Sequence, residues 1–185
     1  MAAPVKYTRE TLVAAALELV RADKPCDARS LAKALGCSTQ PIFRNFPSME
    51  ALRQAVLQAA LARYHRFMDE AVRCSAMPVY KAKGMAYINF ARQEPALFRL
   101  LFMRNRAGES ESPEIVDWLP DTARAGASAG LAGQDAEDFH LEMWAAVHGV
   151  AAMLATGYLQ LDKDTVSRML TDVFQGVKQQ WEAKK

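Results

Sequence analysis

The sequence predicts an all-α protein of about nine helices, with a three-helix N-terminal head on a larger helical body. Apolar residues recur at intervals of three and four along most of the chain, which is the spacing of one face of a helix. No stretch alternates apolar and polar residues over more than a few positions, and runs of Val, Ile and Thr are absent, so strands are not expected. Hydrophobic residues occupy 51% of the 185 positions, which is enough to bury a core.

Capping and terminating residues mark the first two expected helices. One covers residues 8–22, with Thr8 as its N-cap and Pro25 beyond its end. The next begins after Asp27, a second capping residue, and ends at Gly36, the residue type that most readily closes a helix in the left-handed conformation. Each helix carries an apolar stripe, and we expect the two stripes to share one core.

Residues 28–46 have the pattern of a helix-turn-helix. Ala32 is small enough to let two helices touch, Gly36 takes the tight turn, and the β-branched Ile42 locks the second helix onto the first. We expect Ser38 to be the N-cap of that second helix. A helix pair of this kind presents its second helix to a DNA major groove, so the pattern indicates DNA binding.

A long fourth helix is expected over about residues 48–74, which at 1.5 Å per residue spans roughly 39 Å. It connects a helix-turn-helix domain at residues 1–50 to a second helical domain at residues 75–185. The later helices are expected at residues 79–93 and 95–104, after Ser112-Pro113, from Gln134 or Asp135 to about residue 158, and after Asp162.

The net charge of +2 conceals an asymmetry between the two ends of the chain. Up to Arg66 there are ten Lys and Arg against five Asp and Glu, a balance of +5, and the remaining thirteen against sixteen give −3. A basic head on an acidic body suits a protein whose head meets a polyanion. Chance clustering of solvated charges is the alternative, and the helix-turn-helix pattern favours the first interpretation.

Several function classes find no support in the sequence. The three cysteines lack the CxxC spacing of a zinc site, and His65, His140 and His148 show neither metal-ligand nor catalytic-triad spacing. Gly-rich phosphate loops are absent. We therefore expect neither an enzyme nor a bound cofactor or metal. Without a signal peptide or a long apolar run, the chain is expected to be cytoplasmic and without membrane contact.

The helix around Trp144 is apolar nearly all round, so it needs cover on two sides. One side can pack within the body and the other against a second copy, which predicts a homodimer built from this helix and the last one. The predicted interface residues are Val150, Leu154, Tyr158, Met169, Val173, Phe174, Val177 and Trp181.

Aromatic and methionine side chains in the body predict a pocket for a small molecule, because such residues fill and reshape apolar cavities. The predicted lining residues are Phe90, Phe98, Phe102, Trp118, Met143, Trp144 and His148. The alternative is an ordinary packed core, in which His148 is a hydrogen-bonded core histidine.

The head resembles the tetracycline-repressor (TetR) family of bacterial transcription regulators over about residues 8–56. The residues that carry the resemblance are Leu31-Ala32, Leu35-Gly36-Cys37-Ser38, Phe43-Arg44-Asn45-Phe46 and Ser48-Met49-Glu50-Ala51-Leu52. Three positions differ from that family, where a Tyr is usual in place of Phe43, a His is common in place of Asn45, and a Lys in place of Met49.

The body resembles the Trp-His-Gly class of C-terminal domains in the same family. Phe90-Ala91, residues 94–102 and residues 144–149 carry this resemblance, in the expected order. It implies a ligand-responsive, dimerising domain at residues 75–185.

The predicted DNA contacts lie on and around the second helix of the helix-turn-helix. Thr39, Gln40 and Arg44 are the expected base-reading residues, since a Gln near the start of that helix can bind adenine with two hydrogen bonds. The expected phosphate contacts are Lys6, Arg9, Arg29, Ser38, Phe43 and Asn45.

Together these features predict a homodimeric regulator, expected to be a repressor, that binds a palindromic DNA operator and is released by a small apolar or amphipathic effector. The alternative is a helical protein-interaction or ligand-binding module whose helix-turn-helix head has weak or no affinity for DNA. An all-α enzyme is the third and weakest interpretation.

Overall fold

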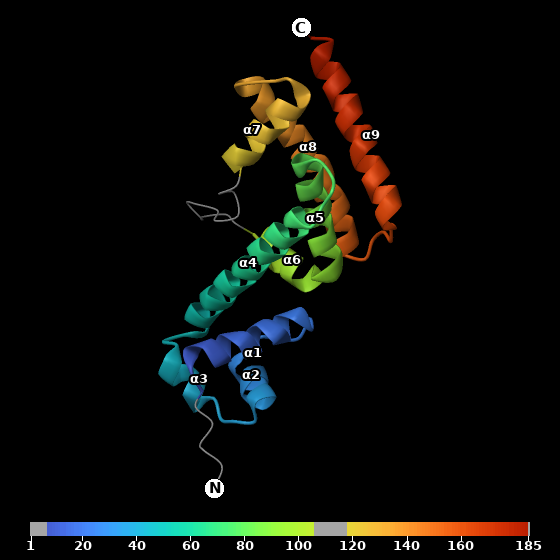
Figure 1. Cartoon of the computed structure of the whole chain (residues 1–185). Helices are drawn as coiled ribbons and strands as arrows, with labels where there is room; N and C mark the ends of the chain where they lie inside the picture. Colours follow the sequence, from blue (N-terminus) through green and yellow to red (C-terminus); the bar gives the residue numbers. More distant parts are fainter. Residues whose placement is uncertain (1–6, 106–117, 185) are drawn as a thin grey trace. The chain divides into compact units, whose positions relative to one another are not determined.

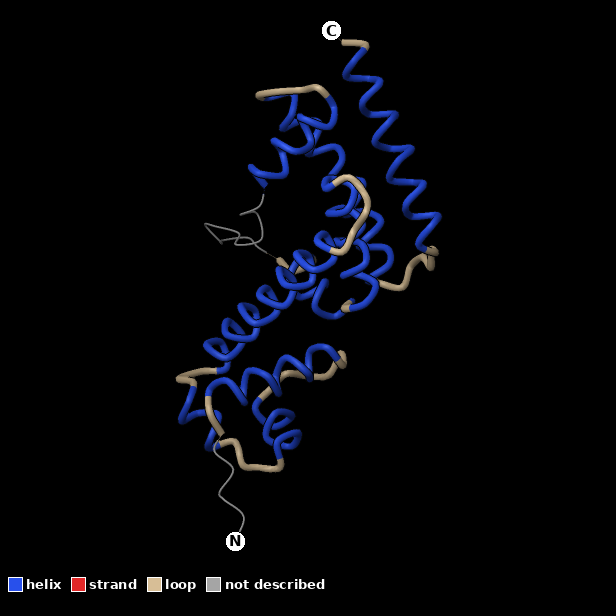
Figure 2. The backbone as a smooth tube through the Cα atoms, in the orientation of Figure 1, coloured by secondary structure: helices blue, strands red, loops and turns tan. Residues whose placement is uncertain are grey.

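A computed structural model describes residues 7–105 and 118–184 of the chain, and of residues 118–120 it describes only the backbone. Nine helices and no strand occur in these ranges. The prediction of an all-α fold is confirmed, and Figures 1 and 2 show how the helices follow one another along the chain. Among these helices, none combines the length and the apolar composition that crossing a bilayer would require.

Contacts between Cα atoms divide the chain into two compact units, residues 1–64 and 65–185. The division falls within the long helix α4 (Met49–Arg73), so α4 contributes to both units. The predicted helix at residues 48–74 is therefore present. The functional boundaries predicted at residues 50 and 75 lie on either side of the structural division and remain predictions.

The first unit contains α1 (Arg9–Arg21), α2 (Ala28–Leu35), α3 (Gln40–Asn45) and the N-terminal part of α4. The side chain of Thr8 accepts a hydrogen bond from the Thr11 N–H, and that of Asp27 accepts one from the Ser30 N–H at 2.8 Å. Both predicted caps are thus confirmed. Apolar side chains from all four helices form the core, and the largest are Leu12, Leu31, Ile42, Phe46 and Leu52.

The turn between α2 and α3 has the geometry that the residue spacing predicts. Gly36 adopts the left-handed conformation with φ of 65° and ψ of 33°, and its N–H donates to the carbonyls of Ala32 and Lys33. The Cys37 N–H also donates to the Ala32 carbonyl, at 3.0 Å. These bonds satisfy carbonyls that would otherwise be left over at the end of α2.

The start of α3 differs from the sequence prediction, because Thr39 and not Ser38 is its N-cap. Thr39 has a helical backbone, with φ of −74° and ψ of −11°, and its side chain makes no capping hydrogen bond. An N-cap side chain usually reaches the first free N–H groups from an extended backbone, which Thr39 lacks. The prediction that Ser38 caps this helix is wrong, and the N-terminal end of α3 has no side-chain cap.

The second unit contains the C-terminal part of α4 and the helices α5 (Val79–Gln93), α6 (Pro95–Phe102), α7 (Trp118–Ala129), α8 (Gln134–Ala155) and α9 (Lys163–Glu182). Helix α8 contacts α5, α6, α7 and α9, so it is the central helix of this unit, with α9 running beside it (Figure 1). Asp162 caps α9 by accepting a hydrogen bond from the Thr165 N–H at 2.8 Å, as expected. The predicted helix start at Ser112-Pro113 lies outside the described residues.

Helix α8 ends three residues earlier than the sequence predicts. Gly157 takes a left-handed φ of 71°, and the Tyr158 N–H turns back to donate to the Met153 carbonyl at 2.9 Å. Two arginines bind carbonyls at the two ends of the α8–α9 connection. Arg99 donates to the Ala155 carbonyl at the end of α8, at 2.6 Å, and Arg92 donates to the Leu161 carbonyl just before α9, at 2.8 Å. Charged donors satisfy these carbonyls and fix the connection to α9.

Helix α7 and the start of α8 approach so closely at Gly126 that a side chain does not fit. A Cβ atom there would lie 2.7 Å from the Leu131 carbonyl oxygen and 2.8 Å from the Ala136 Cβ atom. Both neighbours belong to backbone or to a short side chain, so neither can rotate away. In contrast, a Cβ atom at Gly176 in α9 would meet nothing within 4 Å.

We therefore expect Gly126→Ala and Gly176→Ala to have opposite effects on the free energy of unfolding. Gly126→Ala should destabilise the protein by about 1–3 kcal/mol, because it overpacks the α7–α8 contact. Gly176→Ala, the matched control, should stabilise it by about 0.5–1 kcal/mol, because alanine loses less backbone entropy in a helix. Urea unfolding followed by circular dichroism measures both values, and equal effects would contradict the close approach.

Candidate nucleic-acid interface and effector site

Helix α3 has one face buried in the core of the head and one face exposed to solvent. Ile42 and Phe46 are buried in the core of the head, whereas Gln40 and Arg44 are exposed and lie one helical turn apart. The predicted base-reading residue Thr39 is partly exposed at the start of the same helix. The side of α3 that could enter a groove is thus open to solvent, and it carries an amide and a guanidinium.

The predicted phosphate contacts divide into exposed and engaged side chains. Arg29 and Ser38 are exposed, and Phe43 is 51% exposed on α3 without a hydroxyl group. Arg9 is also exposed, but its guanidinium carbon lies over the ring of Phe46, 4.3 Å from the centroid. Lys6 lies outside the described residues.

Asn45 differs from the other candidates because its side chain is engaged inside the head. Its amide nitrogen donates to the Pro41 carbonyl at 2.8 Å and to the Tyr7 carbonyl at 3.1 Å. Asn45 is only partly exposed, in keeping with these two contacts.

In the body, an aromatic cluster joins α5, α6 and α8, and Tyr87 lies at its centre. The ring of Tyr87 is 5.3 Å from that of Phe98 and 5.1 Å from that of Phe102, measured between centroids. Its hydroxyl oxygen is 2.9 Å from Nδ1 of His148. Trp144 stacks on His148 at 4.9 Å with an interplanar angle of 16°. Three predicted pocket residues, Phe98, Phe102 and His148, therefore contact Tyr87, and a fourth, Trp144, stacks on His148; Tyr87 itself was not among the predicted residues.

The remaining predicted pocket residues make other contacts as well. Phe90 is buried against Phe67 of α4, with ring centroids 5.4 Å apart. Met143 belongs to a different core cluster that includes Phe139 and Trp181. The side chain of Trp118 lies outside the described residues.

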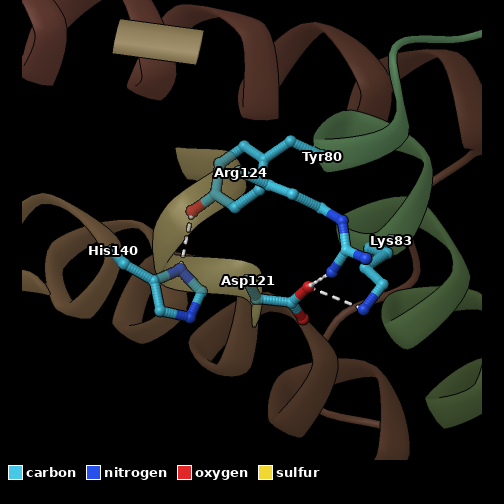
Figure 3. A network of polar contacts seen from close by, with 5 residues as sticks. All are labelled: Tyr80, Lys83, Asp121, Arg124 and His140. Carbon is cyan, nitrogen blue, oxygen red and sulfur yellow. Dashed lines mark hydrogen bonds and ion pairs between the residues drawn. The ribbon is translucent and has the colours of Figure 1, made fainter. Parts of the chain in front are cut away.

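A second group of polar side chains connects α5, α7 and α8 (Figure 3). Asp121 accepts hydrogen bonds from Lys83 at 2.6 Å and from Arg124 at 2.8 Å. Beside it, the Tyr80 hydroxyl oxygen lies 2.9 Å from Nδ1 of His140. Burial raises the pKa of Tyr80 far above its usual range, and the Asp121 carboxylate adds to this effect.

Two Tyr–His pairs thus run along the contact between α5 and α8. Tyr80 meets His140 and Tyr87 meets His148, so the contacts advance in the same direction and the two helices are parallel. The sequence contains a signal for these pairs, because residues seven or eight positions apart lie on one face of a helix. That spacing does not reveal which other helix supplies the partner.

Most of the residues predicted at the dimer interface pack within the chain itself. Val150, Leu154 and Trp181 are buried, while Val173, Phe174 and Val177 pack partly against the cluster around Phe139. Met169 is partly exposed, and Tyr158 is 79% exposed. The largest exposed apolar side chains on α8 itself are Leu141 and Trp144, at 52% and 40%.

Within the described ranges, His, Cys, Asp and Glu side chains do not gather in threes as a metal site would require. The three cysteines are free thiols, and burial raises the pKa of Cys26.

The comparison with protein families identifies the body. Residues 80–174, about half of the 185 residues, match the family described as Tetracyclin repressor-like, C-terminal domain. The chain therefore belongs to the tetracycline-repressor family of transcription regulators, as the sequence resemblance predicts. The match begins at Tyr80, so it is independent of the helix-turn-helix pattern in the head. No curated protein sequence matches the chain significantly.

The Tyr80–His140 pair leads to a prediction about pH. Burial lowers the pKa of His140, and the Lys83 ammonium adds to this effect while Asp121 opposes it. In the unfolded chain the imidazole has its ordinary pKa of about 6.5, so as the pH falls below that value the unfolded state binds the proton first. The free energy of unfolding should therefore fall between pH 7 and pH 5, by at most about 1.4 kcal/mol per pH unit from this group.

His140→Gln keeps a hydrogen-bonding side chain but removes the titration. Its free energy of unfolding should change less between pH 7 and pH 5 than that of the wild type, as measured by urea unfolding at each pH. The same pH dependence in both proteins would show that His140 is not the group responsible.

Proposed function

We propose that this regulator is a homodimeric repressor that binds a palindromic operator and is released by a small apolar or amphipathic molecule. The observation that carries the proposal is the exposed polar face of α3 in a head attached to a body of this family. Recognition by a helix-turn-helix needs such a face, with the opposite face held in the core.

In the proposed complex, each subunit inserts α3 into the major groove of one operator half-site. Gln40 reads a base, with adenine as the natural partner of an amide, Thr39 contacts the groove beside it, and Arg44 meets a phosphate at the edge of the groove. Arg9 and Arg29 are exposed cations on α1 and α2 that suit phosphate oxygens and set the register of the head.

The aromatic cluster around Tyr87 supports the effector part of the proposal. Flat rings from Phe98, Phe102 and Trp144 surround one polar Tyr–His pair, a composition that suits an apolar ligand with a single polar group. The effector would release DNA by binding more tightly to the conformation in which the two heads are wrongly spaced for the operator.

Exposed apolar residues on α8 support the homodimer. Leu141 and Trp144 lie three positions apart on one face of that helix and are both at least 40% exposed. A two-fold contact would pair this face with itself and remove both side chains from water.

One observation favours the alternative of a protein-interaction module. Phe43 is an apolar side chain on the outer face of α3, and it is 51% exposed at a position where the family usually has Tyr. A phenylalanine there suits an apolar protein surface, and it lacks the hydroxyl group that a Tyr could direct at a phosphate. The following measurement separates the two functions.

The test of DNA binding is selection of duplexes from a random-sequence pool by the wild-type protein. On the selected duplex, Gln40→Ala should cost about 1–3 kcal/mol per subunit and relax the preference at one position in each half-site. Arg44→Ala should weaken binding to selected and unrelated duplexes alike, and reduce the slope of log affinity against log salt by about 0.9 per subunit.

Fluorescence anisotropy over a salt series measures both effects, and Gln93→Ala, which removes an exposed amide from α5, is the control. Failure of the wild type to enrich any sequence or to bind random duplex would favour the protein-interaction alternative. If the Gln40 and Arg44 variants lose affinity equally on selected and unrelated duplexes, Gln40 does not read a base.

The test of the dimer is a charge on the exposed face of α8. Leu141→Asp should make the free energy of dimer formation less favourable by several kcal/mol without unfolding the subunit, because each copy would bury an unpaired carboxylate at the interface. Val79→Asp, which changes an equally exposed residue at the start of α5, should leave the dimer intact. Sedimentation at micromolar concentration distinguishes these states, and a monomeric wild type would refute the dimer.

A further inference from the structure

The first described residues of the chain contact both helices of the helix-turn-helix. The Tyr7 hydroxyl donates to the Leu35 carbonyl at the end of α2, at 3.4 Å, and the Tyr7 carbonyl accepts from the Asn45 amide at the end of α3. Arg9 then lies over Phe46, the residue that follows α3. We name Tyr7, Arg9, Asn45 and Phe46 the N-terminal clamp.

Asn45 is the residue of the clamp that joins α3 to the start of α1. An amide nitrogen carries two N–H groups, and both contacts of Asn45 Nδ2 are to carbonyl oxygens of the head, at 2.8 and 3.1 Å. The remaining polar atom of the side chain, Oδ1, can only accept a hydrogen bond. Because a phosphate oxygen of DNA is also an acceptor, the Asn45 side chain has no hydrogen-bond donor to offer it.

Helix α3 depends on contacts of this kind because it is too short to be stable alone. It has six residues, and nucleating a helix is unfavourable until several turns have formed. Its N-cap residue Thr39 supplies no capping hydrogen bond. The orientation of α3 therefore rests on the buried Ile42 and Phe46 and on the bonds made at its C-terminal end.

Arg9 reinforces that C-terminal end. Its Nη1 donates to the Asn45 carbonyl at 3.4 Å, and its guanidinium covers the ring of Phe46. A cation beside the last carbonyls of a helix is favourable, and so is its position over an aromatic face. Asn45 and Arg9 thus hold the same end of α3 from two sides.

We propose that Asn45 is a positioning residue that sets the orientation of α3 for sequence recognition and makes no contact with the DNA backbone. This inference rests on the proposed DNA-binding function. It assigns Asn45 a role in specificity, since a small rotation of α3 displaces Gln40 from a base edge while the exposed cations still meet phosphates.

The experiment compares Asn45→Ala with Gln58→Ala, which removes an exposed amide from α4 in the same unit. Affinity is measured for the duplex selected by the wild type and for an unrelated duplex, at several salt concentrations. Amide hydrogen exchange of residues 42–46 is measured without DNA. Tyr7→Phe, which removes the hydrogen bond to Leu35 and so loosens the residue whose carbonyl accepts from Asn45, is a milder second variant that tests the same contact if Asn45→Ala unfolds the head.

We expect Asn45→Ala to weaken binding to the selected duplex about tenfold, with less than about a twofold change on the unrelated duplex and an unchanged salt slope. Exchange of the α3 amides should become about tenfold faster, while exchange in α5 stays the same. Tyr7→Phe should move both quantities in the same direction by a smaller factor, and Gln58→Ala should move neither.

Equal losses on both duplexes would assign Asn45 to the DNA backbone and overturn the proposal, as would unchanged exchange in α3. If the wild type binds neither duplex, the proposed function fails, and hydrogen exchange alone decides the role of Asn45. Faster exchange in the variant would then still support a positioning role, and unchanged exchange would refute it.

Discussion

The body of this protein depends on the burial of α8. This helix carries apolar side chains on several faces, and α5, α6, α7 and α9 all pack against it. Burying such a helix removes a large apolar area from water, which is the main stabilising contribution available to a helical domain. The neighbours leave Leu141 and Trp144 exposed on one face of α8, at 52% and 40%.

Hydrogen bonds between α5, α7 and α8 set the register in which these helices pack. Tyr80–His140 and Tyr87–His148 pair across α5 and α8, and Lys83 binds Asp121 between α5 and α7. Apolar contacts tolerate small shifts of one helix along another, whereas hydrogen bonds of 2.6–2.9 Å do not. A ligand that disturbed the pair at Tyr87 would therefore act on the same contact that aligns the central helices.

The head depends on different contacts, because its other helices must hold the six-residue helix α3 in place while one face of α3 stays exposed to solvent. Gly36 makes the tight turn between α2 and α3, and the buried Ile42 holds α3 against the core of the head. Both features could be predicted from residue type and spacing. The engagement of Asn45 by Tyr7 could not, since the two residues are 38 positions apart and nothing in their spacing connects them.

The sequence by itself determined the all-α class, the turn at Gly36 and the caps at Thr8, Asp27 and Asp162, because these features depend on backbone conformation within a few residues. Only the tertiary structure decided which side chains meet across helices. It placed Tyr87 at the centre of the aromatic cluster, packed Phe90 against Phe67 and put Met143 in a different core cluster, since helical spacing shows that a residue faces inward but not which neighbour it meets. It also buried Leu154 while exposing Leu141, a difference that depends on the packing of α5, α6, α7 and α9 around α8.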